Sequence, residues 1–235
     1  MAIAESPLYL IPHYLVNKFY PALVFAFTVA SAPAASIAWS ATPAAFYGFD
    51  LFSGADVPVG ALVRVGNFNI TDTVIQQNAL NVTFLNSNFV EAGSTTIGTA
   101  GVGNNPGFFT ASSDYNATTT GLAGKQVYFW VFSGTTVGNS AQIGIFYQPL
   151  ANNSTWAFPS DTPTPGSTAV AISDLITASP DTLRAEAKVV VGTFGPGTST
   201  LTGRRAFTLS NIPEPGSAIL ALAGGLTMLA RRRRS

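Results

Sequence analysis

The sequence predicts an all-β fold: a β-sandwich, of which a jelly roll is one form, with one or two short helices. Closure of the strands into a barrel is the alternative. Residues 45–212 contain repeated short runs rich in Val, Ile, Phe, Tyr and Thr, and Gly, Asn, Pro and Asp separate these runs. Only 9% of all residues are charged, against roughly 25% in an ordinary soluble domain. A surface hydrated by neutral hydroxyl and amide groups is common among extracellular β-proteins.

The predicted strands follow these apolar runs along the chain. Their ranges are 45–52, 61–67, 107–112, 125–132, 142–147, 155–158, 167–172, 188–194 and 205–209. The clearest is 125–132, because its residues after Gln126 are apolar on both faces of the strand. We therefore expect this strand in the centre of a packed sheet.

One segment, residues 71–80, departs from the strand pattern. Thr71 or Asp72 is suited to cap the start of a helix, and apolar residues follow at three positions. The segment therefore predicts a short helix. A second helical turn is expected within residues 174–184, where Pro180 limits its length.

The charge and the reactive residues exclude several classes of function. Residues 42–212 hold six basic and nine acidic residues, a net charge of −3, which argues against nucleic-acid binding. The chain has no cysteine, and its single histidine, His13, lies outside this range. Hydrolysis by a serine or cysteine with a histidine base is therefore excluded. A zinc site would need carboxylates alone, which zinc rarely uses, and we expect no metal and no cofactor.

Two weaker chemistries stay open. A glycan-active enzyme needs two carboxylates across a cleft, and the nine acidic residues permit this, although no motif marks a pair. Asn152, Asn153 and Asp161 offer the oxygen ligands that calcium prefers, but they are also typical turn residues. We expect turns at these positions and no enzyme activity.

Residues 1–41 are predicted to be a signal peptide that includes a helix. Lys18 supplies a basic charge, and the apolar run 20–32 follows it. Small residues then offer two cleavage sites, one after Ala34 and one after Ala38. The sequence does not decide between them. The alternative is that the apolar run is a buried strand or helix of the folded domain.

The C-terminus consists of three parts in succession. These are Pro213, Glu214 and Pro215, then the uncharged residues 216–230, then Arg231, Arg232, Arg233 and Arg234. As a helix the apolar part would span roughly 22 Å, against about 30 Å for the hydrocarbon core of a bilayer. We expect a short transmembrane helix, with the arginine cluster as a membrane stop on the cytoplasmic side and the rest of the chain outside.

This arrangement resembles the PEP-CTERM sorting domain over residues 212–235. The resemblance implies that an integral-membrane exosortase recognises Pro213, Glu214 and Pro215 and cleaves near them, in a bacterium that makes exopolysaccharide. The expected partners before processing are the export machinery, the exosortase and the membrane. The expected location is the cell envelope, the cell surface or the extracellular matrix. A plain C-terminal anchor that is never processed is the alternative.

These predictions divide the chain into a signal peptide (1–41), a β-rich passenger domain (42–212) and a sorting tail (213–235). For the passenger domain we expect a structural or adhesive role linked to exopolysaccharide. The alternatives are a carbohydrate-binding module and a carboxylate-dependent glycan-active enzyme. Trp156, Tyr115 and Tyr147 are the candidate residues for stacking on a sugar, whereas Trp130, in the most apolar strand, is expected in the core.

Overall fold

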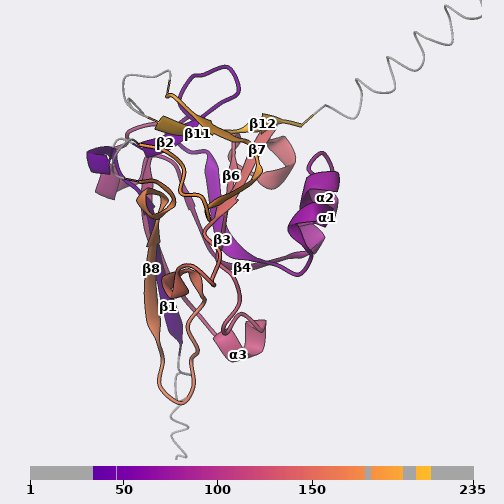
Figure 1. Ribbon diagram of the computed structural model, residues 1–235, viewed down its shortest axis with the longest axis vertical. Coiled ribbons are helices and arrows are strands. Elements are labelled where there is room, and N and C mark those ends of the chain that lie inside the picture. The colour runs from indigo at the N-terminus through magenta and orange to yellow at the C-terminus, as the bar shows by residue number, and fades with distance from the viewer. Residues whose placement is uncertain (1–33, 46, 178–180, 198–204, 213–235) are drawn as a thin grey trace, which may run out of the picture. The chain divides into compact units, whose positions relative to one another are not determined.

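The computed structural model describes residues 34–45, 47–177, 181–197 and 205–212, all of which belong to one compact unit of the chain. The predicted sorting tail with its arginine cluster and most of the predicted signal peptide lie outside these residues. The described part is mainly β, with three sheets and a few short helices (Figure 1).

The first two sheets have three strands each. The first has the order β5 (Phe109–Tyr115), β1 (Ala35–Ala41) and β8 (Ser167–Ala171). The second has the order β10 (Thr193–Gly195), β11 (Arg205–Thr208) and β2 (Tyr47–Asp50). Each contains one parallel pair, β1 with β8 and β11 with β2, beside an antiparallel one.

The third sheet has six strands, and all of its pairs are antiparallel. Its order is β12 (Ser210–Asn211), β7 (Gln142–Tyr147), β6 (Tyr128–Phe132), β3 (Leu62–Phe68) and β4 (Phe89–Thr96), and β9 (Lys188–Val191) also pairs with β7. Because β12 pairs with the start of β7 and β9 with its end, the two short strands share one edge of β7.

The helices are short. They are α1 (Asp72–Gln77), α2 (Val82–Ser87), α3 (Ala117–Thr120) and the 3₁₀ turns η1 (Pro43–Ala45), η2 (Ala100–Val102), η3 (Val137–Asn139), η4 (Ser154–Trp156) and η5 (Ile172–Leu175). Thr71, Asn81 and Asn116 cap the three α-helices, since their side chains accept a hydrogen bond from a backbone N–H three residues later. The predicted cap at Thr71 is therefore confirmed.

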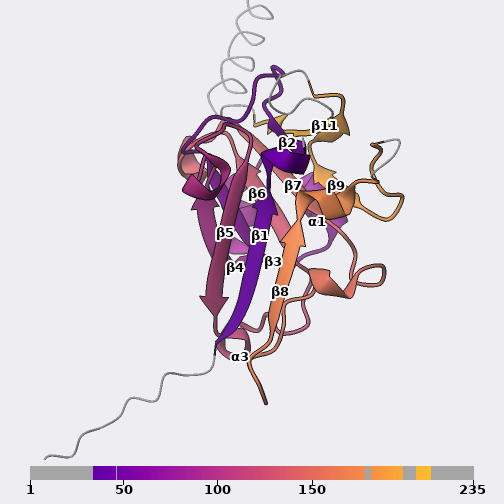
Figure 2. The ribbon, with the colours of Figure 1, turned by 90° about the vertical axis from the view of Figure 1, so that its left-hand side faces the viewer.

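Apolar side chains of the first and third sheets meet between them. Phe109 of β5 and Phe129 of β6 have ring centroids 6.0 Å apart. A Cβ atom placed on Gly93 of β4 would lie 2.7 Å from the Trp39 ring of β1. Figure 2 shows the first sheet in front of β3, β4 and β6, and Figure 1 shows α1 and α2 on the opposite side of the third sheet. Strand β6 is buried at every residue and lies between β7 and β3, so the prediction of a central strand within residues 125–132 is confirmed.

The strand predictions differ from the structure at several places, and residues 188–194, predicted as one strand, form β9 in the third sheet and β10 in the second. Residues 155–158 do not form a strand, because Asn153 caps the 3₁₀ turn η4 with hydrogen bonds from the N–H and hydroxyl of Thr155. Strand β4 was not predicted, because its residues Glu91, Gly93 and Ser94 interrupt the apolar pattern. It is held instead by seven paired positions along β3.

The fold begins before the predicted boundary at residue 42. Strand β1 lies within the segment predicted as a signal peptide, and it is the middle strand of the first sheet. Its alternate residues Ala35, Ile37, Trp39 and Ala41 are buried in the core. The boundary after residue 41 is therefore wrong as a limit of the folded domain.

Strand β1 also distinguishes the two predicted cleavage sites. We expect signal cleavage after Ala34, because a cut after Ala38 would remove the fully buried Ala35 and Ile37 and half of the pairing of β1. If the predicted signal peptide is removed, N-terminal sequencing of the processed protein should start at Ala35. The substitution Ala34→Arg should block this cut, whereas Ala38→Arg, on the exposed face of β1, should not. A mature chain that starts at Trp39 would contradict this expectation.

Candidate functional site

An aromatic layer lies between the third sheet and the two helices α1 and α2. Side chains alternate along a strand, so Tyr128, Trp130 and Phe132 of β6 share this face. Phe68 and Phe89 join them from β3 and β4, with ring centroids 5.2 and 5.1 Å from that of Trp130. All five rings are buried, and the prediction that Trp130 is a core residue is confirmed. The layer holds the helices on the sheet.

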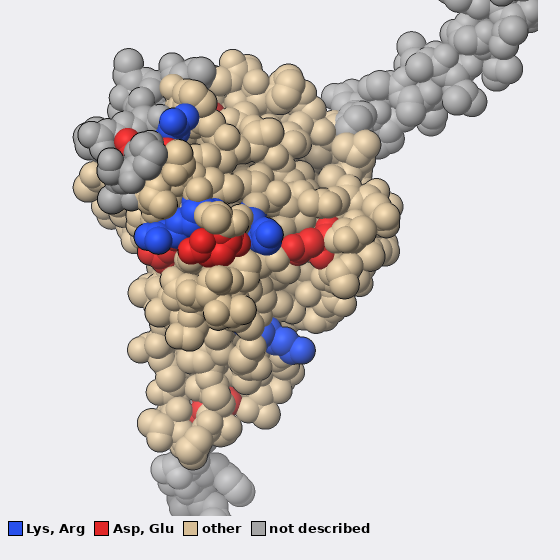
Figure 3. Space-filling model, in the orientation of Figure 1, with Lys and Arg blue, Asp and Glu red and all other residues tan. Residues whose placement is uncertain are grey.

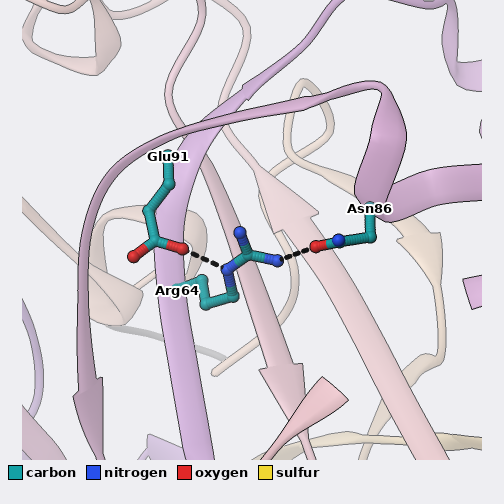
Figure 4. A network of polar contacts seen from close by, with 3 residues as sticks. All are labelled: Arg64, Asn86 and Glu91. Carbon is teal, nitrogen blue, oxygen red and sulfur yellow. Dashed lines mark hydrogen bonds and ion pairs between the residues drawn. The ribbon is translucent and has the colours of Figure 1, made fainter. Parts of the chain in front are cut away.

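Arg64 of β3 closes one side of this layer (Figure 4). Its guanidinium carbon lies 4.7 Å from the ring centroid of Phe89 and 5.2 Å from that of Trp130. Its Nε donates to Glu91, and its Nη1 donates to Asn86 of α2 at 2.6 Å. A guanidinium flanked by two aromatic rings and held by two hydrogen bonds joins α2 to the sheet. Arg64 therefore stabilises the fold, since its Nε and Nη1 donate to acceptors of the protein itself.

Asp72, in the first turn of α1, closes the other side. The hydroxyl of Tyr128 donates to Asp72 Oδ1 at 3.0 Å, and that of Tyr147 donates to Oδ2 at 2.5 Å. The two tyrosine rings lie 4.5 Å apart. Burial raises the pKa of Tyr128 above its ordinary value, and the negative charge of Asp72 is the second cause of this increase. Burial and the hydrogen bond to Asp72 likewise raise the pKa of Tyr147.

This cluster predicts a loss of stability at alkaline pH. In the unfolded chain a tyrosine hydroxyl ionises at about pH 10. In the folded protein Tyr128 and Tyr147 stay protonated at this pH, because their pKa is raised. Its contribution to stability is complete below about pH 10 and falls as the pH rises toward the folded-state pKa. The urea midpoint should therefore decrease above this pH. The double variant Tyr128→Phe/Tyr147→Phe should show a shallower decrease, and an identical decrease would contradict the role of the cluster.

The residues predicted to stack on a sugar are buried. The exposed fraction is 0% for Trp156, 6% for Tyr115 and 8% for Tyr147. The indole Nε1 of Trp156 donates to Asp174 at 3.2 Å, and the hydroxyl of Tyr115 donates to the carbonyl of Pro159 at 3.1 Å. Stacking requires an exposed ring face, which none of the three rings has. The expectation that they bind a sugar is therefore wrong for this conformation.

The loop residues considered for calcium bind other parts of the fold. Asp161 accepts hydrogen bonds from the backbone N–H and the hydroxyl of Thr118 at the start of α3, and these bonds hold the pKa of Asp161 below its ordinary value. Asn153 donates to the side chain of Gln148 and caps η4. Within the described ranges, no three His, Cys, Asp or Glu side chains lie close enough together to hold a metal ion.

The surface around the last described residue, Ile212, is uncharged and hollowed, and its lining mixes apolar residues with polar ones such as Asn81 and Asn139. A pocket of about 430 Å³ lies between the turn joining α1 to α2 and the η3 loop, with Leu80, Val137 and Ile212 in its wall. A second pocket of about 300 Å³ shares Leu80 and runs along β12 and β9. None of the residues lining these two pockets is charged.

Three large apolar side chains are exposed in the described part of the chain. They are Phe52 at 66%, Leu80 at 60% and Val59 at 53%. Phe52 and Val59 belong to the loop between β2 and β3, and Leu80 to the turn between α1 and α2. We name the surface formed by Phe52, Val59, Leu80 and Ile212 the apolar end. Sequence reasoning missed it, because isolated apolar residues in loops carry no periodic signal.

A series of hydrogen bonds places Ile212 and the loop of Phe52 and Val59 at the same end of the third sheet, and Leu80 lies beside Ile212 in the pocket wall. Ile212 N donates to the carbonyl of Ala141 at 2.7 Å, and Phe52 N donates to the side chain of Gln142, the next residue, at 2.8 Å. Gln142 begins β7 and accepts from Ser133, which follows β6. Gly134 in turn accepts from Leu62, three residues after Val59. Strand β12, which directly precedes Ile212, pairs with Gln142 and Ile143 at this same end of the sheet.

Comparison with known proteins yields no relative for this chain. No protein-family model matches it, and neither a curated protein nor a solved structure matches it either. Among the residues that the structure describes, no helix has the length and apolar character needed to cross a membrane. The predicted sorting residues Pro213 to Pro215, the apolar stretch 216–230 and the arginine cluster lie outside the described residues.

Proposed function

We propose that the chain is an exported surface or extracellular-matrix protein that an exosortase sorts through a PEP-CTERM tail. The observation that carries this proposal is the position of the tail relative to the fold. The last strand, β12, ends at Asn211, and the last described backbone hydrogen bond comes from Ile212. The motif begins at the next residue, Pro213. A processing enzyme would therefore meet the motif directly at the boundary of a folded domain.

The proposed role of the domain is structural or adhesive rather than enzymatic. In support, none of the three pockets at the apolar end and on the first sheet contains two carboxylates, and Asp174 is the one acidic residue in their walls. Asp174 itself accepts hydrogen bonds from Trp156 and from the backbone of Ala171. A link to exopolysaccharide rests on the sorting tail, since the aromatic rings considered for sugar binding are buried.

The finer fold class is part of the proposal. We assign the domain to the β-sandwiches, because the inner faces of the first and third sheets supply one continuous core. The parallel pairs β1–β8 and β11–β2 count against a jelly roll, whose strands run antiparallel.

Production of the full chain in two strains of an exopolysaccharide-forming bacterium, with and without its exosortase gene, tests the proposed function. With the exosortase, the chain should lose its tail and appear outside the inner membrane. Without it, the chain should keep the tail and fractionate with the inner membrane. The variant Glu214→Ala should behave as if the exosortase were absent, whereas Glu186→Ala, an acidic residue of the domain, should be processed normally. Equal processing in both strains would contradict the proposal.

A further inference from the structure

We infer that the apolar end of the domain lies on the surface of the lipid bilayer while the tail is inserted in it. This inference rests on the proposed function, because it takes the apolar stretch 216–230 to be the membrane segment. It adds to that function an orientation of the domain and a second contact with the membrane.

The first argument is the length of the connection. Three residues, 213–215, separate Ile212 from the apolar stretch that starts at Gly216. Even a fully extended chain covers at most about 3.3–3.6 Å per residue, so the four steps from Ile212 to Gly216 span at most roughly 14 Å. The headgroup region on each side of the hydrocarbon core is about 5–8 Å thick. Ile212 is held to Ala141 by a backbone hydrogen bond, so the surrounding surface must stay within reach of the headgroups.

The second argument is the location of the exposed apolar side chains. Phe52, Val59 and Leu80 come from two separate loops. Hydrogen bonds place the loop of Phe52 and Val59 at the end of the sheet where the chain leaves the fold, and Leu80 shares a pocket wall with Ile212 there. In water their exposed surface costs free energy, and insertion into the headgroup boundary removes that cost. A short tether also keeps this surface beside the bilayer at a high effective concentration, so weak insertion of each side chain is sufficient.

The third argument is the lack of charge. The walls of both pockets at the apolar end hold only neutral residues, with Ile212 and Leu80 among them. In Figure 3 many of the charged side chains on the viewed face lie in a band across its middle, with others at the upper left and toward the lower end, and the described surface at the upper right is tan. The pocket walls could therefore be covered by lipid without dehydrating a charged group, whereas the loop of Phe52 and Val59 contains one half-buried carboxylate, Asp56.

Labels at single cysteines test this inference, since the natural chain has none. The full chain carrying Phe52→Cys, Leu80→Cys, Ser112→Cys or Leu222→Cys is labelled with a polarity-sensitive fluorophore and reconstituted in vesicles of phosphatidylethanolamine and phosphatidylglycerol. Ser112 is exposed on the first sheet and serves as the control. Leu222 lies in the apolar stretch and reports insertion of the tail itself. Quencher lipids with a nitroxide near the headgroup or deep in the acyl chain then measure depth.

The inference predicts a blue shift and quenching by the shallow nitroxide at positions 52 and 80, none at 112, and quenching by the deep nitroxide at 222. Quenching at 222 without quenching at 52 and 80 would overturn the inference and leave the proposed function intact. No quenching at 222 would overturn the proposed membrane segment, and the inference with it. A blue shift at 52 and 80 that is insensitive to quencher lipids and grows with protein density would instead indicate contact with a second copy and would also overturn the inference.

Discussion

Replacement of Trp156 by alanine should lower the free energy of unfolding by about 3–5 kcal/mol, the range found when buried aromatic residues are truncated. The indole is fully buried, and its ring centroid lies 5.3 Å from that of Phe129 in the centre of the third sheet. The substitution would leave a cavity and would also remove the hydrogen bond to Asp174. Chemical denaturation of the purified full chain in detergent measures the loss.

The variant Trp156→Phe separates packing from hydrogen bonding. It keeps most of the apolar contact with Phe129 and loses the donor to Asp174, so we expect a loss of about 1–2 kcal/mol. A Trp156→Ala protein as stable as the natural one would show that the ring is exposed and would reopen sugar stacking at this site. Loss of polysaccharide binding in Trp156→Ala would therefore reflect a destabilised domain and would not locate a sugar site.

Replacement of Gly66 by alanine should destabilise the protein by about 3 kcal/mol or more, at the upper end of the cost of overpacking. Gly66 lies opposite a β-bulge in strand β4, because Val65 pairs with Gly93 and Gly66 with Glu91, which leaves Ala92 unpaired. An added Cβ would lie 2.2 Å from the carbonyl oxygen of Val90 and 2.5 Å from the ring of Phe89. The backbone carbonyl cannot rotate away, so β3 and β4 would have to separate.

Gly195→Ala is the matched control for this substitution. Gly195 also lies in a strand, β10, but a Cβ there would meet no atom within 4 Å, and its φ is not in the left-handed region. We expect a change within about 0.5 kcal/mol, as for other surface substitutions. Similar urea midpoints for Gly66→Ala and Gly195→Ala would contradict the close contact between β3 and β4.

The sequence predicted those strands and helices whose ends are marked by nearby turn or capping residues. Strand β7 was predicted at its observed bounds because turn residues flank its apolar run, and α1 was predicted because Thr71 is a recognisable cap. Strand β1 was read as part of a signal peptide, because its small residues also suit a cleavage site. Only its pairing with β5 and β8, which are distant in sequence, makes it a strand.

The candidate sites also differ in how far they could be predicted, because some are contiguous in sequence and others are assembled from distant segments. The sequence of the tail is contiguous, so its three parts could be recognised directly. The burial of Trp156 could not be predicted from the sequence, because it depends on contact of this residue of turn η4 with Phe129 of strand β6. The apolar end is assembled from two loops and the end of β12 through hydrogen bonds that no local pattern predicts.

The intact mass of the protein isolated from the cell envelope or matrix of its source tests the central claim most directly, because it reads both ends of the chain in one measurement. The account predicts a chain that starts at Ala35 and ends close to the motif at Pro213 to Pro215, without the apolar stretch and the arginine cluster. A mass of 24.4 kDa, that of the whole chain, would contradict both export processing and sorting.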